Sequence, residues 1–379
     1  MSRPILLLLL SVGIVGVTAL MLSPIASAVA EGLPGATAEG VLLGAAVYGA
    51  ATALSALLFA PQADRFGADR SLQAALCVLA LGFAGAAISP SLTGFVLAQA
   101  LLGLATGLAL PSAYALAAHA APAGREAQTM GLVLSGWTLS LVAGVSLAAF
   151  GAEFLGWRTM FFALALMATA VLVGVLRTGF EAPRGRATSP LTGLRVPGIG
   201  RALAMMGALM LGFYFTYTYI GTHVTQTLGR STAEAGLVPL IYGLGFGATT
   251  LLDRYIDRIG PARTARPLFA FNVALYIAMA MAAPNFGALL FLAFVWGFTQ
   301  HLGLNLAVGR LTALDPAQRG AILGLNSCVT YTMVFIGAAI GGVFFSQLGF
   351  PALPLFSALL LAYMALEAGT PSAWRQHAH

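Results

Sequence analysis

The chain has 379 residues, of which 8% are charged and 59% hydrophobic, and its mean hydropathy is +0.91. Soluble domains carry about 25% charged residues, so this composition excludes a surface of the ordinary water-facing kind. The net charge is +6, but all 18 basic residues are Arg and lie in short segments between apolar runs, a placement that excludes a nucleic-acid-binding surface.

Apolar runs of about 20 residues recur along the chain, and a helix of that length crosses about 30 Å of hydrocarbon. The sequence therefore predicts an all-α polytopic membrane protein with twelve transmembrane helices. The first run, which follows Arg3 and ends at Ala26-Ser27-Ala28, also fits a cleaved signal peptide, but its removal would leave an odd number of spans. The expected spans are residues 5–30, 38–60, 71–89, 92–118, 128–153, 158–177, 200–222, 234–252, 267–283, 286–309, 320–347 and 350–368.

The second half of the chain repeats the first at a nearly constant spacing of 193 or 194 residues. Two six-helix bundles related by an axis along the membrane normal are typical of secondary transporters, with a cavity between them. We expect an N-terminal bundle (1–177) and a C-terminal bundle (200–379), joined by a flexible cytoplasmic linker (178–199) rich in Arg, Pro and Gly. The matching pairs are Asp64/Asp257, Arg65/Arg258, Gly67/Gly260, Gly103/Gly297, Pro122/Pro316, Arg125/Arg319, Gly131/Gly324, Gly144/Gly337 and Gly156/Gly349.

The distribution of Arg predicts the orientation, since short cytoplasmic loops are enriched in basic residues. With both termini in the cytoplasm, every Arg except Arg158 and Arg230 falls on the cytoplasmic side of the twelve spans. We therefore expect both termini to be cytoplasmic.

The charged turn after the second span resembles a signature of the major facilitator superfamily, G-x-x-x-D-R-x-G-R-[RK]. Asp64, Arg65 and Gly67 match it, whereas Ala60 replaces its first Gly and Arg70 lies one position late. The segments "FLGWRTMFF" (154–162), "FTYTYIGTHV" (215–224) and "LDPAQRGAILGLNS" (314–327) are similar to the bacterial drug and sugar efflux branch, the arabinose-efflux-permease-like drug:proton antiporters.

In the family that the chain resembles, this turn belongs to a cytoplasmic gate that latches the two halves and stabilises the outward-open state. A glycine permits the tight turn, and a carboxylate there can accept hydrogen bonds from Arg and from a helix N-terminus. The alternative is that these charges only anchor the topology, although anchoring requires no Asp. The gate residues that the resemblance implies are Asp64, Arg65, Gly67, Arg70, Asp257, Arg258 and Gly260.

The same resemblance implies that helices 1, 4, 7 and 10 line the cavity, so their polar and aromatic side chains are candidates for binding substrate. Alternatives remain for several of them: His301 as a neutral hydrogen-bonding group between helices, the tyrosines of helix 7 as an interfacial belt, and Gln99 as a partner of a neighbouring helix. The candidate substrate-binding residues are Thr18, Gln99, Tyr214, Tyr217, Trp296, Gln300, His301 and Asn305.

Proton coupling has few candidates, because no Asp or Glu falls at mid-depth in any expected span. His301 is the ionisable residue at mid-depth, and ionisable residues inside membranes are generally functional. Glu31, beside the first outer loop, is a second candidate, with a solvated loop charge as its alternative. The Arg of the antiporter signature R-x-x-Q-G in helix 4 is replaced by Gln99, and the helix 5 signature has lost its Pro at Gly144-Val145-Ser146.

The sequence thus favours a secondary transporter of the bacterial inner membrane that works by alternating access. We expect proton-coupled efflux of a small amphipathic or sugar-like molecule; an uncoupled facilitator or an importer of a small organic solute is the alternative. An enzyme is disfavoured because no H-E-x-x-H motif or paired intramembrane carboxylates are present. We expect a monomer in the lipid bilayer, with the small-molecule substrate and protons as partners, and no cofactor, metal or nucleic acid.

Overall fold

The computed structural model describes residues 2–122, 124–180, 182, 184, 189–249 and 259–368, and within these residues it contains helices and no strand. The first half contains α1 (Arg3–Leu20), α2 (Leu22–Glu31), α3 (Ala38–Leu58), α4 (Gln62–Phe66), α5 (Ala68–Ile88), α6 (Leu92–Ala120), α7 (Glu126–Leu139), the π-helix η1 (Ser140–Gly144), α8 (Val145–Leu155) and α9 (Trp157–Thr178). The second half contains the 3₁₀ helix η2 (Pro190–Arg195), α10 (Ile199–Thr222), the π-helix η3 (His223–Thr227), α11 (Thr232–Ala235), α12 (Leu237–Ala248), α14 (Pro261–Met281), α15 (Phe286–Leu314), the 3₁₀ helix η5 (Pro316–Gln318), α16 (Arg319–Leu348) and α17 (Ala352–Ala368).

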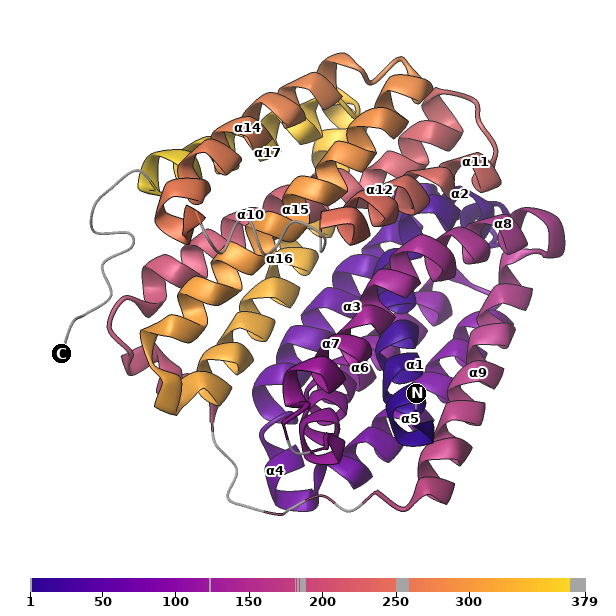
Figure 1. Ribbon diagram of the computed structural model, residues 1–379. Coiled ribbons are helices and arrows are strands. Elements are labelled where there is room, and N and C mark those ends of the chain that lie inside the picture. The colour runs from indigo at the N-terminus through magenta and orange to yellow at the C-terminus, as the bar shows by residue number, and fades with distance from the viewer. Residues whose placement is uncertain are drawn as a thin grey trace.

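These helices confirm an all-α polytopic membrane protein. Among the described residues, ten helical stretches are long and apolar enough to cross a membrane, and α17 is a shorter apolar helix of 17 residues. The expected eighth span corresponds to α12, which the short helix α11 precedes, and its last residues lie outside the described part of the chain. Figure 1 shows two bundles side by side, one from indigo to magenta and one from rose through orange to yellow. They meet where α3 packs against α16, α2 against α10, and η1 against α12.

The spans run between two faces of the molecule, which we call the linker face and the far face. The linker face carries the start of α1 at Arg3, the turn at Gly67 after α4, and the helix η2. The far face carries the turns at Gly35 and Gly229. Successive spans run alternately between these two faces.

The internal repeat is visible in the way the helices begin. Thr37 accepts a hydrogen bond from the backbone N–H of Gly40, and its counterpart in the second half, Ser231, accepts one from that of Glu234. Side-chain oxygens at these positions satisfy N–H groups that have no partner inside the helix. Ser91 and Asn285 form a second pair of N-caps with the same spacing, and each begins a helix of 29 residues.

Contacts inside the two bundles repeat in the same way. The hydroxyl group of Ser55 donates to the carbonyl oxygen of Leu104 at 2.6 Å, and that of Thr249 donates to the carbonyl oxygen of Phe298 at 3.1 Å. Both members of the second contact lie at the repeat spacing from those of the first. Three pairs of glycines with positive φ complete the repeat: Gly35/Gly229, Gly67/Gly260 and Gly156/Gly349.

The segment before α10 differs from the expected flexible linker. Residues Pro190–Arg195 form η2, which packs against the linker-face end of α16. Pro190 and Gly193 are buried, and a Cβ atom added to Gly324 would lie 2.9 Å from Cγ of Pro190. Proline at the start of a short helix and a glycine on the helix opposite permit this close approach.

Candidate substrate site between the halves

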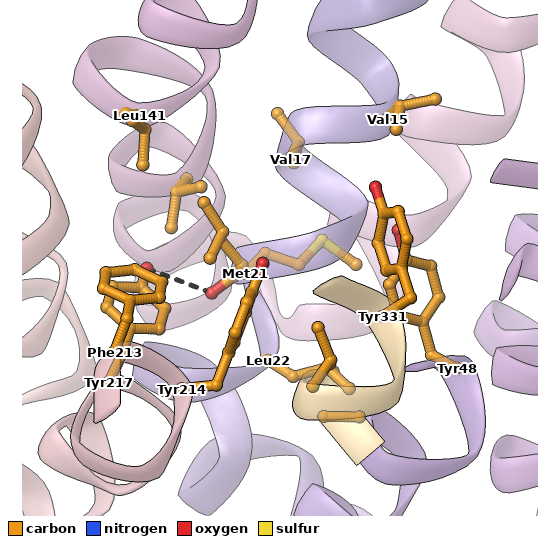
Figure 2. Close-up of a cluster of buried hydrophobic side chains, with 14 of the residues drawn as sticks. Val15, Val17, Met21, Leu22, Tyr48, Leu141, Phe213, Tyr214, Tyr217 and Tyr331 are labelled. Carbon is orange, nitrogen blue, oxygen red and sulfur yellow. Dashed lines mark hydrogen bonds between the residues drawn. The ribbon is translucent and has the colours of Figure 1, made fainter. Parts of the chain in front are cut away.

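The first transmembrane span is broken at Met21, between α1 and α2. Pro24 has no backbone N–H, so the carbonyl oxygen of Leu20 lacks its usual partner within the helix. The hydroxyl group of Tyr217, on α10 of the other half, donates to this oxygen at 3.2 Å. Figure 2 shows the break with the fully buried Met21 beside it. The proline of one half is thus compensated by a tyrosine of the other.

Further bonds join the halves at the far-face side of Met21. The hydroxyl group of Ser23 donates to the carbonyl oxygen of Tyr217 at 2.6 Å, and the hydroxyl oxygens of Ser27 and Thr225 are 2.8 Å apart. At Gly221, a Cβ atom would overlap the carbonyl oxygen of Ser23, so only glycine allows this approach. We call these residues, Ser23, Ser27, Tyr217, Gly221 and Thr225, the far-face closure.

A second contact between the halves lies between α8 and α11. The carboxylate of Glu153 accepts a hydrogen bond from the backbone N–H of Thr232 at 2.9 Å. Thr232 is the first residue of α11, where N–H groups have no partner in the helix and favour negative charge. Through this hydrogen bond the exposed Glu153 contacts the opposite half.

Tyrosines from both halves gather next to the far-face closure. Tyr48 on α3 and Tyr331 on α16 are buried, with their rings edge-on at a centroid distance of 6.3 Å. The hydroxyl group of Tyr48 donates to that of Thr106 at 3.2 Å. Tyr214 on α10 is buried as well. In Figure 2, Met21 lies between Tyr214 on one side and Tyr48 with Tyr331 on the other.

Behind Tyr214, a second aromatic cluster fills the C-terminal bundle. The rings of Phe213 and Tyr217 are stacked at 5.1 Å, and Trp296 packs against Phe213, also at 5.1 Å. Trp296 is fully buried, and its indole N–H donates to the hydroxyl group of Tyr276 at 2.9 Å. This tryptophan therefore supports the site from behind, with its polar atom turned to Tyr276 on α14.

The other candidates on α15 have three different environments. Gln300 is buried, and its Nε2 atom has no hydrogen-bond partner among the described residues. The half-buried His301 packs edge-on against the ring of Phe246 at 4.7 Å. Asn305 is exposed. Of these, Gln300 lies nearest in sequence to the aromatic cluster, one helical turn after Trp296.

The two candidates of the N-terminal bundle are both buried. The hydroxyl group of Thr18 donates to the carbonyl oxygen of Ile14 in its own helix at 2.7 Å, so in this arrangement it does not donate to a ligand. Gln99 is 0% exposed, and neither polar atom of its amide has a hydrogen-bond partner in the described part of the chain. A Cβ atom added to Gly44 would lie 3.1 Å from Cγ of Gln99, which places this side chain against α3.

Sequence reasoning missed Tyr48 and Tyr331, which lie on the second and eleventh spans. The resemblance pointed to helices 1, 4, 7 and 10, so these two spans offered no candidates. A signal was nevertheless present: Tyr48 has a counterpart in Tyr242 at the repeat spacing, and both lie beside a repeated glycine. At Gly103 a Cβ atom would overlap the carbonyl oxygen of Tyr48, and at Gly297 that of Tyr242.

The expected cytoplasmic gate is described only in part. Gly67 and Gly260 have φ angles of 95° and 88°, as the tight turns require. Arg65 and Arg70 are exposed, and Arg65 lies over the ring of Phe66 at 5.7 Å. The side chain of Asp64, and Asp257 and Arg258 entirely, lie outside the described residues. The latch between the halves therefore stays a prediction.

Charged groups away from this site have other environments. Glu31 is exposed at the end of α2.

An ion pair that the sequence did not indicate joins α15 to α17. Both carboxylate oxygens of Glu367 accept hydrogen bonds from the guanidinium of Arg310, at 2.9 and 3.0 Å. Among the described residues, no group of three or more His, Cys, Asp or Glu side chains could hold a metal ion.

Comparisons with known proteins agree with this architecture. The family model described as Major Facilitator Superfamily matches residues 7–300. The chain is 28% identical to the "Uncharacterized MFS-type transporter YwfA" of Bacillus subtilis (strain 168), over 84% of this chain and 80% of that protein. It is 29% identical to the "Chloramphenicol resistance protein" of Streptomyces lividans, over 90% and 88%. A solved structure, "Crystal structure of D-xylose-proton symporter", shares the fold with a TM-score of 0.75 at 18% identity, covering 95% of this chain and 96% of that one.

Proposed function

Because the chain belongs to the Major Facilitator Superfamily, whose members are membrane transporters and not enzymes, we propose that it exports a small amphipathic molecule by proton-coupled alternating access. The membrane is the bacterial inner membrane, with the linker face and both termini in the cytoplasm. Residues 1–177 and 200–379 are the two moving halves of a monomer, joined by residues 178–199.

The observation that carries this proposal is the position of the tyrosines relative to the far-face closure. Tyr214 on one side and Tyr48 with Tyr331 on the other lie around Met21, next to the hydrogen bond from Tyr217 to Leu20 that joins the halves. A molecule that reaches these rings therefore comes from the linker face, which is the cytoplasmic face in the proposed orientation. An exporter must load its substrate from that side.

The chemistry of these side chains favours a neutral molecule with an aromatic part and hydrogen-bonding groups. Phenol rings offer both an apolar face and a hydroxyl group. No described Asp or Glu residue is buried, so no buried carboxylate in that part of the chain attracts a cationic substrate. The name of the Streptomyces relative, a chloramphenicol resistance protein, supports the same class of molecule.

His301 is the residue that we propose for the proton, and Gln300 and Asn305 beside it share α15. The candidates Thr18, Gln99, Tyr217 and Trp296 support the walls of the site. Glu31 is a second proton site, at the far face. The gate on the linker face, in its turn, would hold the outward-open state through Asp64, Arg65, Gly67, Arg70, Asp257, Arg258 and Gly260.

The second candidate function is transport of the substrate without coupling to protons. The lack of a buried Asp or Glu among the described residues favours it. Reconstituted vesicles with a pH-sensitive dye inside distinguish the two functions. Chloramphenicol and D-xylose would be added as probes under an imposed proton gradient. Proton movement that depends on the probe, and that His301→Ala abolishes while His119→Ala on the exposed end of α6 does not, supports coupling. Probe flux without proton movement would establish a facilitator.

The substrate site is tested in the same vesicles. Removal of the hydroxyl group in Tyr214→Phe or Tyr331→Phe should raise the KM of the exported probe about threefold to tenfold, since a hydrogen bond contributes about 1 kcal/mol. Tyr363→Phe, a change at a 58% exposed tyrosine on α17, is the matched control. Unchanged KM values in both site variants would place the substrate elsewhere.

A further inference from the structure

His223 begins the π-helix η3 at the far-face end of α10 and is only 3% exposed. Its Nε2 atom lies 2.8 Å from the carbonyl oxygen of Ala283, and its ring stacks on that of Phe350 at 4.5 Å with an interplanar angle of 13°. A carbonyl oxygen can only accept, so the N–H of the neutral ring is on Nε2. The Nδ1 atom is then a bare acceptor. It is buried, with no hydrogen-bond partner among the described residues.

In the N-terminal bundle, the equivalent carbonyl oxygen and aromatic ring contact a permanent cation, Arg158 on α9. The guanidinium of Arg158 donates to the carbonyl oxygen of Ser89 at 3.2 Å and lies over the ring of Trp157 at 4.2 Å. Ala283 and Phe350 are the counterparts of Ser89 and Trp157 at the repeat spacing. One far-face corner thus holds a carbonyl oxygen and an aromatic ring around a guanidinium, and the other holds them around an imidazole. An aromatic face and a carbonyl oxygen both favour a cation.

The imidazole belongs to the segment that closes the far face. Thr225, two residues after His223, lies in the same π-helix and contacts Ser27 across the boundary between the halves. Single π-helical turns are frequent at functional sites. A change at His223 therefore acts directly on a residue of the far-face closure.

The charged groups on neighbouring elements already have other partners or are exposed. Arg230 and Glu234 pair with each other at 3.0 Å beyond the end of η3. Glu153 accepts from the backbone N–H of Thr232 at the start of α11. Glu31, on α2, is exposed. None of these carboxylates is a hydrogen-bond partner of Nδ1 of His223.

We propose that Nδ1 of His223 is a proton-binding site that links acidity at the far face to opening of that face. A proton from solvent adds to the lone pair of Nδ1 and gives an imidazolium, which retains its bond to Ala283 and its contact with Phe350. The new Nδ1–H group requires an acceptor, and the closed arrangement of the described residues supplies none. When η3 moves away from α2, water can accept this bond. Protonation thereby favours the open far face, and opening in turn favours protonation.

This inference rests on the proposed alternating access but not on the identity of the substrate. Its test is a distance measurement between spin labels at Leu155 and Leu348, two equivalent far-face positions of the repeat that are each 65% exposed. The labels are placed in a chain without Cys77 and Cys328, in lipid nanodiscs. On acidification from pH 7.5 to pH 5.5, the ratio of the long-distance to the short-distance population should rise about tenfold, an effect within the range of ordinary coupling energies.

Three variants make the test specific. His223→Gln can still donate to Ala283 but cannot bind a proton at this pH, so its distances should not respond to acid. His223→Arg carries a permanent positive charge in the place of the imidazolium and should hold the open population at both pH values. His301→Gln should respond to acid as the unaltered chain does.

Two outcomes would overturn the proposal. One is an equal pH response of the distances in His223→Gln and in the unaltered chain, and the other is closed far-face distances in His223→Arg. Export in vesicles with no pH response of the distances would reject this site while leaving the proposed function intact.

Discussion

The hydroxyl group of Tyr217 donates a hydrogen bond to the carbonyl oxygen of Leu20, 3.2 Å away in the opposite half of the molecule. This oxygen is available because Pro24, four residues later, has no N–H group. The contact therefore ties the break in the first span to the closed arrangement of the two halves. It also pairs a buried carbonyl group that would otherwise lose a hydrogen bond.

Tyr217→Phe should weaken the far-face closure by about 1 kcal/mol, because a buried carbonyl oxygen loses its partner. The ratio of open to closed molecules would rise about fivefold, since each 1.4 kcal/mol corresponds to a factor of ten. Spin-label distances between Leu155 and Leu348 measure this ratio. Pro24→Ala supplies an N–H group to Leu20 from within the helix, so Tyr217→Phe should have a smaller effect in that background. An equal effect in both backgrounds would contradict the role given to Pro24.

Gly297→Ala should destabilise the C-terminal bundle strongly, because the new Cβ atom would overlap the backbone carbonyl oxygen of Tyr242. A backbone carbonyl group cannot rotate away as a flexible side chain can. Overpacking of this kind lowers the free energy of unfolding by about 1–3 kcal/mol. Thermal unfolding in detergent measures the loss. Gly309→Ala on the same helix is the matched control, because no atom lies within 4 Å of the added Cβ. Similar melting temperatures for the two variants would show that α12 can move away from α15 at no cost.

Gln99→Leu should raise the stability of the protein by about 1 kcal/mol, since an unpaired buried amide carries a desolvation cost that an apolar side chain of similar size does not. The measurement is again thermal unfolding, with the exposed Gln128→Leu as the control. A fall in the melting temperature of Gln99→Leu would mean that the amide has a partner, such as an ordered water molecule, in the folded protein.

Glu234 should make the turn at α11 sensitive to acid. Its pKa lies below the ordinary value of 4.5, first because its carboxylate accepts from the backbone N–H of Ser231 and also because Arg230 is adjacent. A lowered pKa in the folded state means that the stabilisation is complete above pH 4.5 and is lost as the pH falls through the lowered value. Glu234→Gln should therefore flatten the pH dependence of amide exchange at Thr232–Ala235 between pH 5 and about pH 3. Glu39→Gln, in the first turn of α3, should leave that dependence unchanged.

Much of the fold could be predicted from the sequence, because apolar length and glycine spacing are local properties. The expected span 92–118 corresponds to α6 at Leu92–Ala120, and the expected span 286–309 to α15 at Phe286–Leu314. Glycines that match in the two halves adopt matching backbone angles, as at Gly67 and Gly260. Periodicity could not predict the order of the segment before α10, since η2 owes its place to packing against α16.

The candidate site was less accessible to sequence reasoning. Tyr214 lies beside the boundary between the halves, and the two tyrosines on the other side of Met21, Tyr48 and Tyr331, come from spans that the resemblance did not indicate. Trp296, a candidate for binding substrate, packs against Phe213, and its N–H donates to Tyr276. Which side of a buried helix faces a partner depends on tertiary packing, and a helix that is apolar all round gives no periodic signal for it.

The bonds of the far-face closure join hydroxyl and carbonyl groups, none of which carries a net charge. A membrane potential of 100 mV acts on one elementary charge with about 2.3 kcal/mol, so it exerts no comparable force on these contacts. Breaking these hydrogen bonds moves no net charge across the membrane. A current that accompanies turnover in a voltage-clamped membrane therefore reports charged groups such as the transported molecule, a proton or the carboxylate of Glu153, and not the movement of Ser23, Ser27, Tyr217 or Thr225.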